Sequence, residues 1–171
     1  MTPPPPPVWR EPTLRLPLRW GGYRSRLVAG GILLAVGALL IVQTTAYTTT
    51  LGWLGAVVHF SGWVILPARG GRRSIAAPAS LLSFVLMLIG PPLVWLTAIP
   101  LALWLLVRER PGITYVLVPL PALCTAVALV LFGAFVPKLG LFIGVFAVAV
   151  LCAWAARSIA LRERSSSEPV S

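Results

Sequence analysis

One histidine among apolar residues is the side chain of this 171-residue chain best suited to chemistry. His59 is the only histidine, and it lies at the centre of Leu51 to Pro67, a stretch without formal charge. In a helix it would lie roughly 12 Å from either end of that stretch. If the stretch crosses a membrane, such a group serves by default as a proton relay or a ligand contact. The alternative is a structural role, in which a neutral ring bonds to a hydroxyl on another helix.

Three further polar residues are candidates for the same neighbourhood or for a separate site. Ser83 and Thr125 reach a depth similar to that of His59 in their own apolar stretches and could bond to its ring. Gln43, followed by two threonines, ends the first stretch and could form a site that opens outward. The ligand-binding candidates are therefore His59, Gln43, Ser83 and Thr125.

The composition argues against catalysis. The chain has no Asp or Asn, and its carboxylates all lie outside the apolar stretches: Glu11, Glu109, Glu163 and Glu168. A nucleophile and base made of Ser83 and His59 would lack an orienting group and the glycines that usually flank such a serine. One His and two Cys without a nearby carboxylate make a poor metal site. We therefore expect a non-enzymatic protein with no catalytic residue, no metal and no cofactor.

The apolar stretches that must position these residues have the length of membrane spans. Only 11% of the residues are charged, against about 25% in soluble domains. A spanning helix needs about 20 residues, with a range of about 17 to 25. The six stretches without charge are 27–47, 51–67, 75–90, 92–107, 113–136 and 139–156.

These stretches predict an all-α integral membrane protein with a transmembrane domain over 27–156. We expect six transmembrane helices arranged as three antiparallel hairpins. The third and fourth stretches are short and are separated by Gly90-Pro91-Pro92, where paired prolines should break a helix. A re-entrant pair that does not cross the membrane is the alternative for 75–107.

The basic residues indicate an orientation. All 13 arginines lie in 1–26, 68–74, 108–112 and 157–171, which alternate with segments that hold one Lys in total, Lys138. Because basic residues in short loops stay cytoplasmic, we expect both termini in the cytoplasm. The Arg-rich, Lys-poor composition is typical of GC-rich genomes, which favours a bacterial protein of the cell (inner) membrane.

The terminal segments suggest lipid contacts. The Pro- and Arg-rich tail, 1–26, could bind anionic lipid headgroups through Arg15, Arg19, Arg24 and Arg26, or these residues could only set the orientation. The segment 157–171 is expected to be a disordered cytoplasmic tail. Nucleic acid is not an expected partner, because the positive charge is divided among four membrane-edge segments.

Small residues four apart would allow helices to pack closely, although this spacing arises easily in a chain so rich in Gly and Ala. The pairs include Gly31/Ala35, Gly52/Ala56 and Gly140/Gly144.

Two functions fit this architecture. The first is a packing or assembly partner of another membrane or cytoplasmic protein, or of a second copy. The second is a small transport component that binds a neutral or apolar solute between helices kinked at Pro100, Pro119 and Pro121. In size, six spans and cytoplasmic termini the chain resembles the substrate-binding components of energy-coupling-factor vitamin importers. The Ala-x-x-x-Ala pattern of that family's first span is absent, so no family is assigned.

Overall fold

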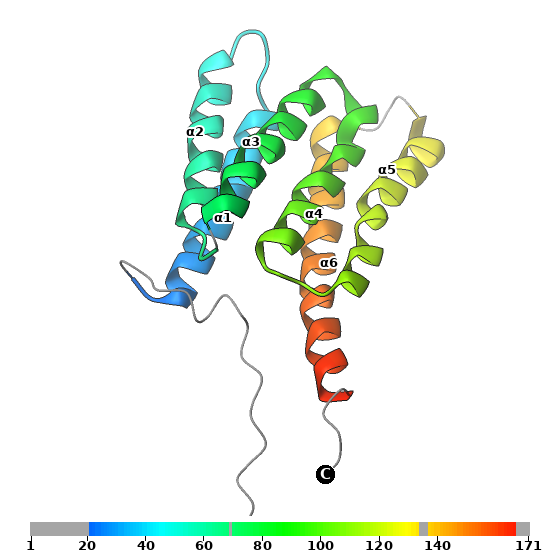
Figure 1. Cartoon of the computed structure of the whole chain (residues 1–171). Helices are drawn as coiled ribbons and strands as arrows, with labels where there is room; N and C mark the ends of the chain where they lie inside the picture. The colour runs from blue at the N-terminus through cyan, green and yellow to red at the C-terminus, as the bar shows by residue number, and fades with distance from the viewer. Residues whose placement is uncertain (1–20, 69, 134–136, 167–171) are drawn as a thin grey trace, which may run out of the picture.

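Helices make up the regular secondary structure of this protein. The computed structural model describes residues 21–68, 70–133 and 137–166, and these contain helices and turns but no strand. Successive helices run up and down the bundle in alternate directions, so that α1 starts and α6 ends at the same end (Figure 1).

Six α-helices and three short 3₁₀ helices follow one another along the chain. The α-helices are α1 (Tyr23–Val42), α2 (Thr49–Ile65), α3 (Gly70–Leu86), α4 (Ala98–Val107), α5 (Pro119–Phe132) and α6 (Lys138–Ser166). The 3₁₀ helices are η2 (Met87–Ile89), η3 (Pro91–Thr97) and η4 (Gly112–Leu117). Prolines begin η3 and α5, where a missing N–H costs no helical hydrogen bond.

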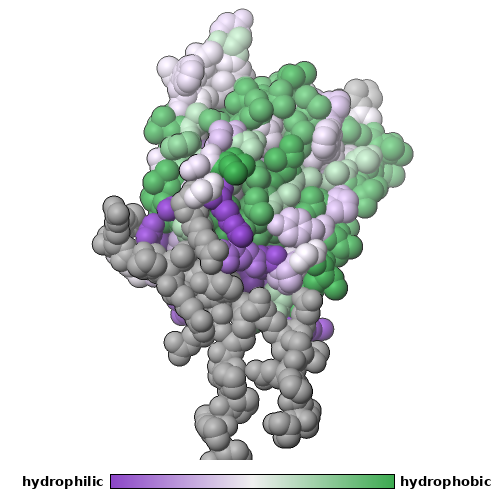
Figure 2. Space-filling model, viewed as in Figure 1, coloured by the Kyte–Doolittle hydropathy of each residue, from purple (hydrophilic) through white to green (hydrophobic). Residues whose placement is uncertain are grey.

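Four of the helical segments are long and apolar enough to cross a membrane. They are Tyr23–Val42, Gly71–Ile89, Gly112–Phe132 and Lys138–Arg162. Large hydrophobic side chains such as Val130 and Leu131 point outward, and hydrophobic residues cover most of the described surface in Figure 2. The sequence-based expectation of an all-helical, membrane-embedded protein is confirmed at this level. Two shorter apolar segments, Thr49–Ile65 and Pro91–Val107, accompany the four.

The first helix ends five residues earlier than the apolar stretch predicts. Threonines turn the chain after Val42: Thr44 Oγ1 donates to the Leu40 carbonyl at 3.0 Å, and the Thr45 amide donates to Thr48 Oγ1 at 2.9 Å. Hydroxyls that bond to nearby backbone groups compete with continued helix.

The last helix is longer than predicted. We expected disorder from residue 157, but α6 continues to Ser166. Ala156 and Ala160, four residues apart, are both fully buried, so this face of α6 still packs on the bundle beyond the predicted end. The predicted tail is therefore helical over 157–166, and the rest of it lies outside the described residues.

Glycines seven residues apart bring α1 and α2 into backbone contact. Gly30 faces Gly62, and Gly37 faces Gly55 and the backbone of His59. A Cβ atom added to Gly37 would lie 2.4 Å from the His59 amide nitrogen, and one added to Gly55 would lie 2.9 Å from the Gly37 carbonyl oxygen. A period of seven keeps one face of each helix against its partner along their length.

The predicted spacing of four does not describe this contact. A Cβ atom on Gly31 or Gly144 would meet nothing within 4 Å. The helices therefore meet on the face of Gly30 and Gly37, one residue away from the face that the Gly31/Ala35 pair would present.

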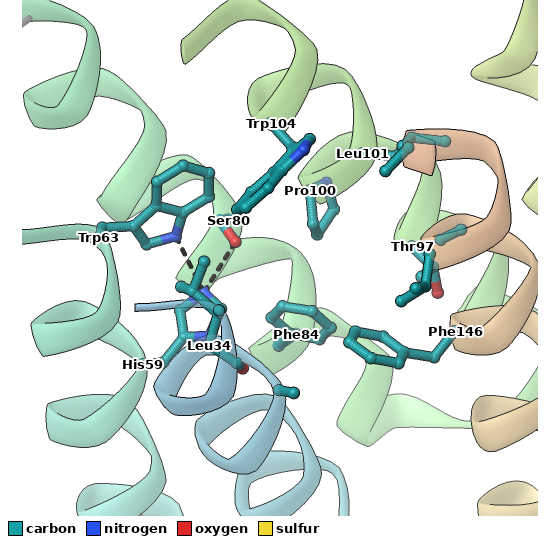
Figure 3. Close-up of a pocket in the computed structure, with 15 residues that line it drawn as sticks. Leu34, His59, Trp63, Ser80, Phe84, Thr97, Pro100, Leu101, Trp104 and Phe146 are labelled. Carbon is teal, nitrogen blue, oxygen red and sulfur yellow. Dashed lines mark hydrogen bonds between the residues drawn. The ribbon is translucent and has the colours of Figure 1, made fainter. Parts of the chain in front are cut away.

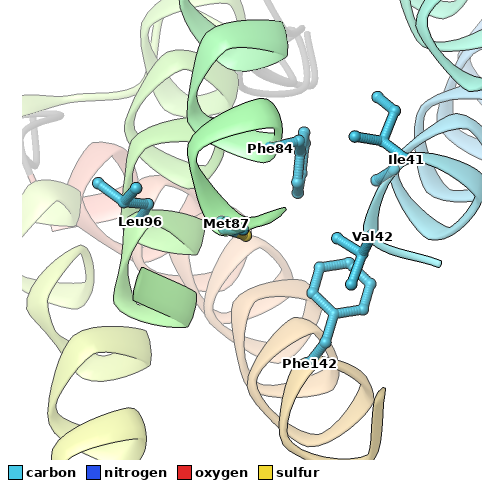
Figure 4. Close-up of a cluster of buried hydrophobic side chains, with 7 residues drawn as sticks. Ile41, Val42, Phe84, Met87, Leu96 and Phe142 are labelled. Carbon is cyan, nitrogen blue, oxygen red and sulfur yellow. The ribbon is translucent and has the colours of Figure 1, made fainter. Parts of the chain in front are cut away.

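A cluster of buried side chains closes the upper end of the bundle. It joins α1, α3, η2, η3 and α6 through Ala38, Ile41, Val42, Phe84, Met87, Leu96 and Phe142 (Figure 4). The rings of Phe84 and Phe142 meet edge to face, with centroids 6.1 Å apart. This cluster connects α1 to α6, although the two helices pack mainly on other helices of the bundle.

Candidate functional site

A pocket lies within the bundle, below the upper cluster. It has a volume of about 320 Å³ and is lined by residues of α1, α2, α3, η3, α4 and α6. Four aromatic side chains form much of its wall: Trp63, Phe84, Trp104 and Phe146 (Figure 3). None of the described residues that line it carries a formal charge.

His59 lies at the wall of this pocket, within reach of polar groups from three helices. Its Nδ1 is 3.1 Å from the Leu34 carbonyl oxygen on α1, and its Nε2 is 2.8 Å from Ser80 Oγ on α3. The indole N–H of Trp63, one turn along α2, donates to the same Nε2 at 3.2 Å. All three side chains, His59, Trp63 and Ser80, are at most 2% exposed.

These partners select one tautomer of the ring. A carbonyl oxygen can only accept, so Nδ1 must carry the hydrogen in its bond to Leu34. An indole N–H can only donate, so Nε2 must present its lone pair to Trp63. Ser80 must then donate its hydroxyl hydrogen to Nε2. The arrangement fits a neutral His59 ring with its hydrogen on Nδ1.

Aromatic packing fixes the plane of this ring. The rings of His59 and Phe84 meet edge to face at 5.0 Å between centroids, and those of His59 and Trp63 do so at 6.5 Å. Such arrangements favour one orientation of each ring. The polar groups of the pocket wall are therefore held in fixed positions.

Of the four predicted ligand-binding residues, the structure places only His59 in the pocket. Ser83 is buried and donates to the Ser80 carbonyl at 2.7 Å, and Thr125 donates to the Pro121 carbonyl at 2.9 Å within α5. Gln43 is exposed where α1 ends. His59 does bond to a serine of another helix, as the structural alternative proposed, but that serine is Ser80.

Sequence reasoning missed Ser80 and Trp63. Trp63 follows His59 by four residues and so shares its helix face, which was a usable signal. Ser80 precedes Ser83 by three residues, and both fall on nearly the same face of α3. Only the packing of α3 against α2 decides which of the two hydroxyls reaches the ring.

The predicted lipid-binding arginines occupy different positions. Arg24 is exposed, whereas Arg26 is only 8% exposed and donates from Nε to the Ile65 carbonyl at 2.9 Å. Arg15 and Arg19 lie outside the described residues. Arg73 also bonds to the end of α2, at the carbonyls of Val64 (2.7 Å) and Leu66 (3.2 Å).

These bonds place positive charge at a helix carboxyl end. The last carbonyls of a helix lack intrahelical partners and carry partial negative charge. Arg72 does the same for α4 by donating to the Leu106 carbonyl at 2.8 Å. Part of the basic charge thus holds helix ends together, so Arg26 has a use within the protein.

No group of three metal-binding side chains occurs among the described residues. Cys124 and Cys152 are both free thiols.

The fold and the pocket define an all-helical protein with membrane-spanning character and an internal, mostly apolar cavity. No protein-family model, curated protein or solved structure matches the chain.

Proposed function

We propose that this protein binds a small, neutral and mostly apolar molecule in the pocket beside His59, as a small transport component of the membrane. The observation that carries the proposal is the pocket itself, which has an aromatic wall and a few polar side chains, those of His59, Ser80 and Thr97. Ligand sites are typically cavities of about 300–1,000 Å³ with apolar linings and a few placed polar groups. A charged ligand would lose its hydration in this pocket without gaining an opposite charge.

We further propose that all six helical segments cross the membrane. The two segments below the usual length are long enough by their rise: α2 has 17 residues and rises about 26 Å. The 3₁₀ helix η3 rises more steeply, so that η3 and α4 together rise about 29 Å. Both values approach the hydrocarbon thickness of about 30 Å.

The lower end of the bundle in Figure 1 is the proposed cytoplasmic side of a cell (inner) membrane. Most of the described arginines lie at helix ends or loops of that side, Arg157 lies in the second half of α6, and hydrophilic residues gather on that side in Figure 2. Lys138 begins α6 at the opposite end. This distribution supports cytoplasmic termini by the positive-inside rule.

The role of an assembly partner is the second hypothesis. It shares the membrane architecture but gives no reason for a pocket in the middle of the bundle. Ligand binding does give such a reason, which is why we favour it.

Substitutions on α1 test the pocket. Ala35 lines it, whereas Ala29 is exposed on the same helix and does not. Ala35→Trp should fill the pocket, and Ala29→Trp should add the same side chain outside it. Wild type and both variants would be purified in mild detergent, and small molecules that copurify identified by mass spectrometry.

We expect a compound enriched with the wild type and Ala29→Trp and at least tenfold reduced with Ala35→Trp. Equal recovery from all three proteins would contradict the proposal. A stoichiometric copurifying protein, with no small molecule, would favour the assembly role instead.

A further inference from the structure

Five α-helices surround the pocket, and one neighbouring pair of them does not pack together. Among the described residues, α1 packs on α2, α2 on α3, α3 on α4 and α4 on α6. The helices α6 and α1 complete the ring but make no extensive contact, apart from the upper cluster that Phe142 joins. The pocket therefore has a gap in its wall between α1 and α6, closed at the upper end.

The residues beside this gap are small or outward-facing. Gly31 of α1 lines the pocket, and an added Cβ there would meet nothing within 4 Å. Val150 of α6 also lines the pocket and is 53% exposed. Because Val150 belongs both to the pocket wall and to the outer surface, the gap is a mouth of the pocket.

This mouth lies at the depth of the hydrocarbon core in the proposed topology. Gly31 follows the cytoplasmic start of α1 by eight residues, and Val150 follows the outer start of α6 by twelve. A rise of 1.5 Å per residue places them about 12 Å and about 18 Å from those ends. The two distances describe one level in a layer of about 30 Å. Lipid chains therefore face the mouth.

The surface that a ligand meets inside the pocket is almost entirely apolar. The polar side chains of the wall, those of His59, Ser80 and Thr97, are at most 2% exposed and are bonded within the protein. Trp104 adds an indole N–H that can donate to a carbonyl or ether oxygen. A hydrocarbon chain, with or without such an oxygen, fits this surface.

An exposed arginine lies below the mouth on each of the two helices. Arg24 precedes Gly31 by seven residues, and Arg157 follows Val150 by seven. Seven residues make nearly two full turns, so each arginine shares the helix face of its mouth residue, about 10 Å closer to the proposed cytoplasmic side. Basic groups between membrane helices on that side bind anionic lipid head groups.

We propose that the pocket holds one hydrocarbon chain of an anionic lipid from the cytoplasmic leaflet. The chain enters between α1 and α6, while the lipid phosphate stays at the membrane surface beside Arg24 and Arg157. This inference rests on the proposed pocket binding and specifies its ligand class. The neutral, apolar part of the ligand is the chain, and the charge stays outside the pocket.

Photoreactive lipids test where the chain lies. Phosphatidylglycerol and phosphatidylcholine, each with a diazirine in the middle of one acyl chain, would be placed with the full protein in nanodiscs and illuminated. Peptide mass spectrometry then identifies the labelled residues. We expect phosphatidylglycerol to label Trp104 and Phe146, which line the pocket (Figure 3), about tenfold more than phosphatidylcholine does.

Two results would overturn the lipid assignment. One is labelling confined to outward-facing residues such as Leu151, which is 64% exposed and does not line the pocket. The other comes from a free long-chain alcohol that carries the same diazirine. If the alcohol labels Trp104 and Phe146 but neither phospholipid does, the ligand is a smaller membrane-dissolved compound.

Substitutions at the mouth test the route. Gly31→Phe should reduce labelling of the pocket residues at least tenfold, whereas Ile32→Phe, at an exposed position outside the pocket, should leave it unchanged. If Gly31→Phe does not fold, Val150→Trp and its neighbour Leu151→Trp make the same comparison from α6. Equal labelling within a pair would overturn entry between α1 and α6.

The arginines are tested by the preference for the anionic lipid. In the double variant Arg24→Gln/Arg157→Gln, labelling by phosphatidylglycerol and phosphatidylcholine should become nearly equal. Arg162→Gln, at another exposed arginine of α6, should keep the preference. An unchanged preference in the double variant would overturn the position assigned to the phosphate.

The outcomes separate this inference from the proposed function. If Ala35→Trp loses a copurifying compound but neither phospholipid labels Trp104 or Phe146, pocket binding stands and the lipid assignment is overturned. If no compound copurifies and no probe labels these two residues, pocket binding itself is wrong.

Discussion

The side chain of His59 bonds to two groups that each allow only one direction of hydrogen bonding. The Leu34 carbonyl accepts from Nδ1, and the Trp63 indole donates to Nε2. A ring with hydrogens on both nitrogens would direct Nε2–H at the Trp63 N–H. His59 therefore acts as a fixed acceptor that orients Ser80, a role that differs from the proton relay considered from sequence.

The nitrogen-15 spectrum of the imidazole can test this arrangement. Because the chain has a single histidine, labelling that residue type gives one ring to assign. We expect a protonated Nδ1 and an unprotonated Nε2 at neutral pH in nanodiscs. In Trp63→Phe the Nε2 resonance should shift, because one of its two donors is lost, whereas Trp53→Phe, an exposed residue of the same helix, should leave it in place. A protonated Nε2 in the wild type would contradict the assigned tautomer.

Close contact between α1 and α2 determines which groups the His59 side chain can bond to. The glycines of the two helices let the backbones approach until Gly37 touches the backbone of His59 itself. A larger residue would separate the helices and lengthen the bond from Nδ1 to the Leu34 carbonyl. The packing of α1 against α2 thus also sets the geometry of the hydrogen bond between His59 and Leu34.

Two glycine positions in α1, Gly31 and Gly37, should respond to alanine in opposite directions. Gly37→Ala places a Cβ atom 2.4 Å from the His59 amide nitrogen, and overpacking of this kind costs about 1–3 kcal/mol. Gly31→Ala meets open space and should stabilise the helix by about 0.5–1 kcal/mol. Thermal unfolding in one detergent would compare both with the wild type. Destabilisation by Gly31→Ala as large as that by Gly37→Ala would show that the helices meet on a different face.

In the molecule as a whole, many of the arginines lie where helices begin or end on one side of the bundle. Arginines gather where α1 begins, where α2 meets α3 and where α4 ends, and several of them bond to carbonyls at the ends of neighbouring helices. The same residues can thus set the proposed orientation and join the helices on the proposed cytoplasmic side. A charge moved to the opposite end would lose both roles.

Reporter fusions can test the proposed six-span topology. A reporter active only in the cytoplasm should be active when fused after residues 69, 110 and 166, and inactive after 48, 90 and 137. The connection at residue 90 distinguishes the two arrangements considered for 75–107. Activity there would mean that α3 and α4 enter and leave the membrane on one side without crossing it.

The sequence alone determined the class of this protein. Long apolar stretches with few charges predict helices in a bilayer, because a helix satisfies every backbone polar group within its own segment. Pro119, which was expected to kink a helix, instead begins α5, but the break at Gly90 to Pro92 did follow from proline's missing N–H. These features depend on residues close together in the chain, so local chemistry was enough to predict them.

Only the tertiary structure decided what surrounds His59. Ser80 and Ser83 are nearly equivalent in sequence, and Gly31 and Gly30 differ by one position, yet in each pair only one residue faces the neighbouring helix at the contact described. A rotation of one helix about its axis exchanges such residues while keeping every apolar stretch intact. Because hydropathy is almost uniform around α1 and α2, the rotation of these two helices is set by shape, through glycine contacts and aromatic packing, and the pocket exists only once it is set.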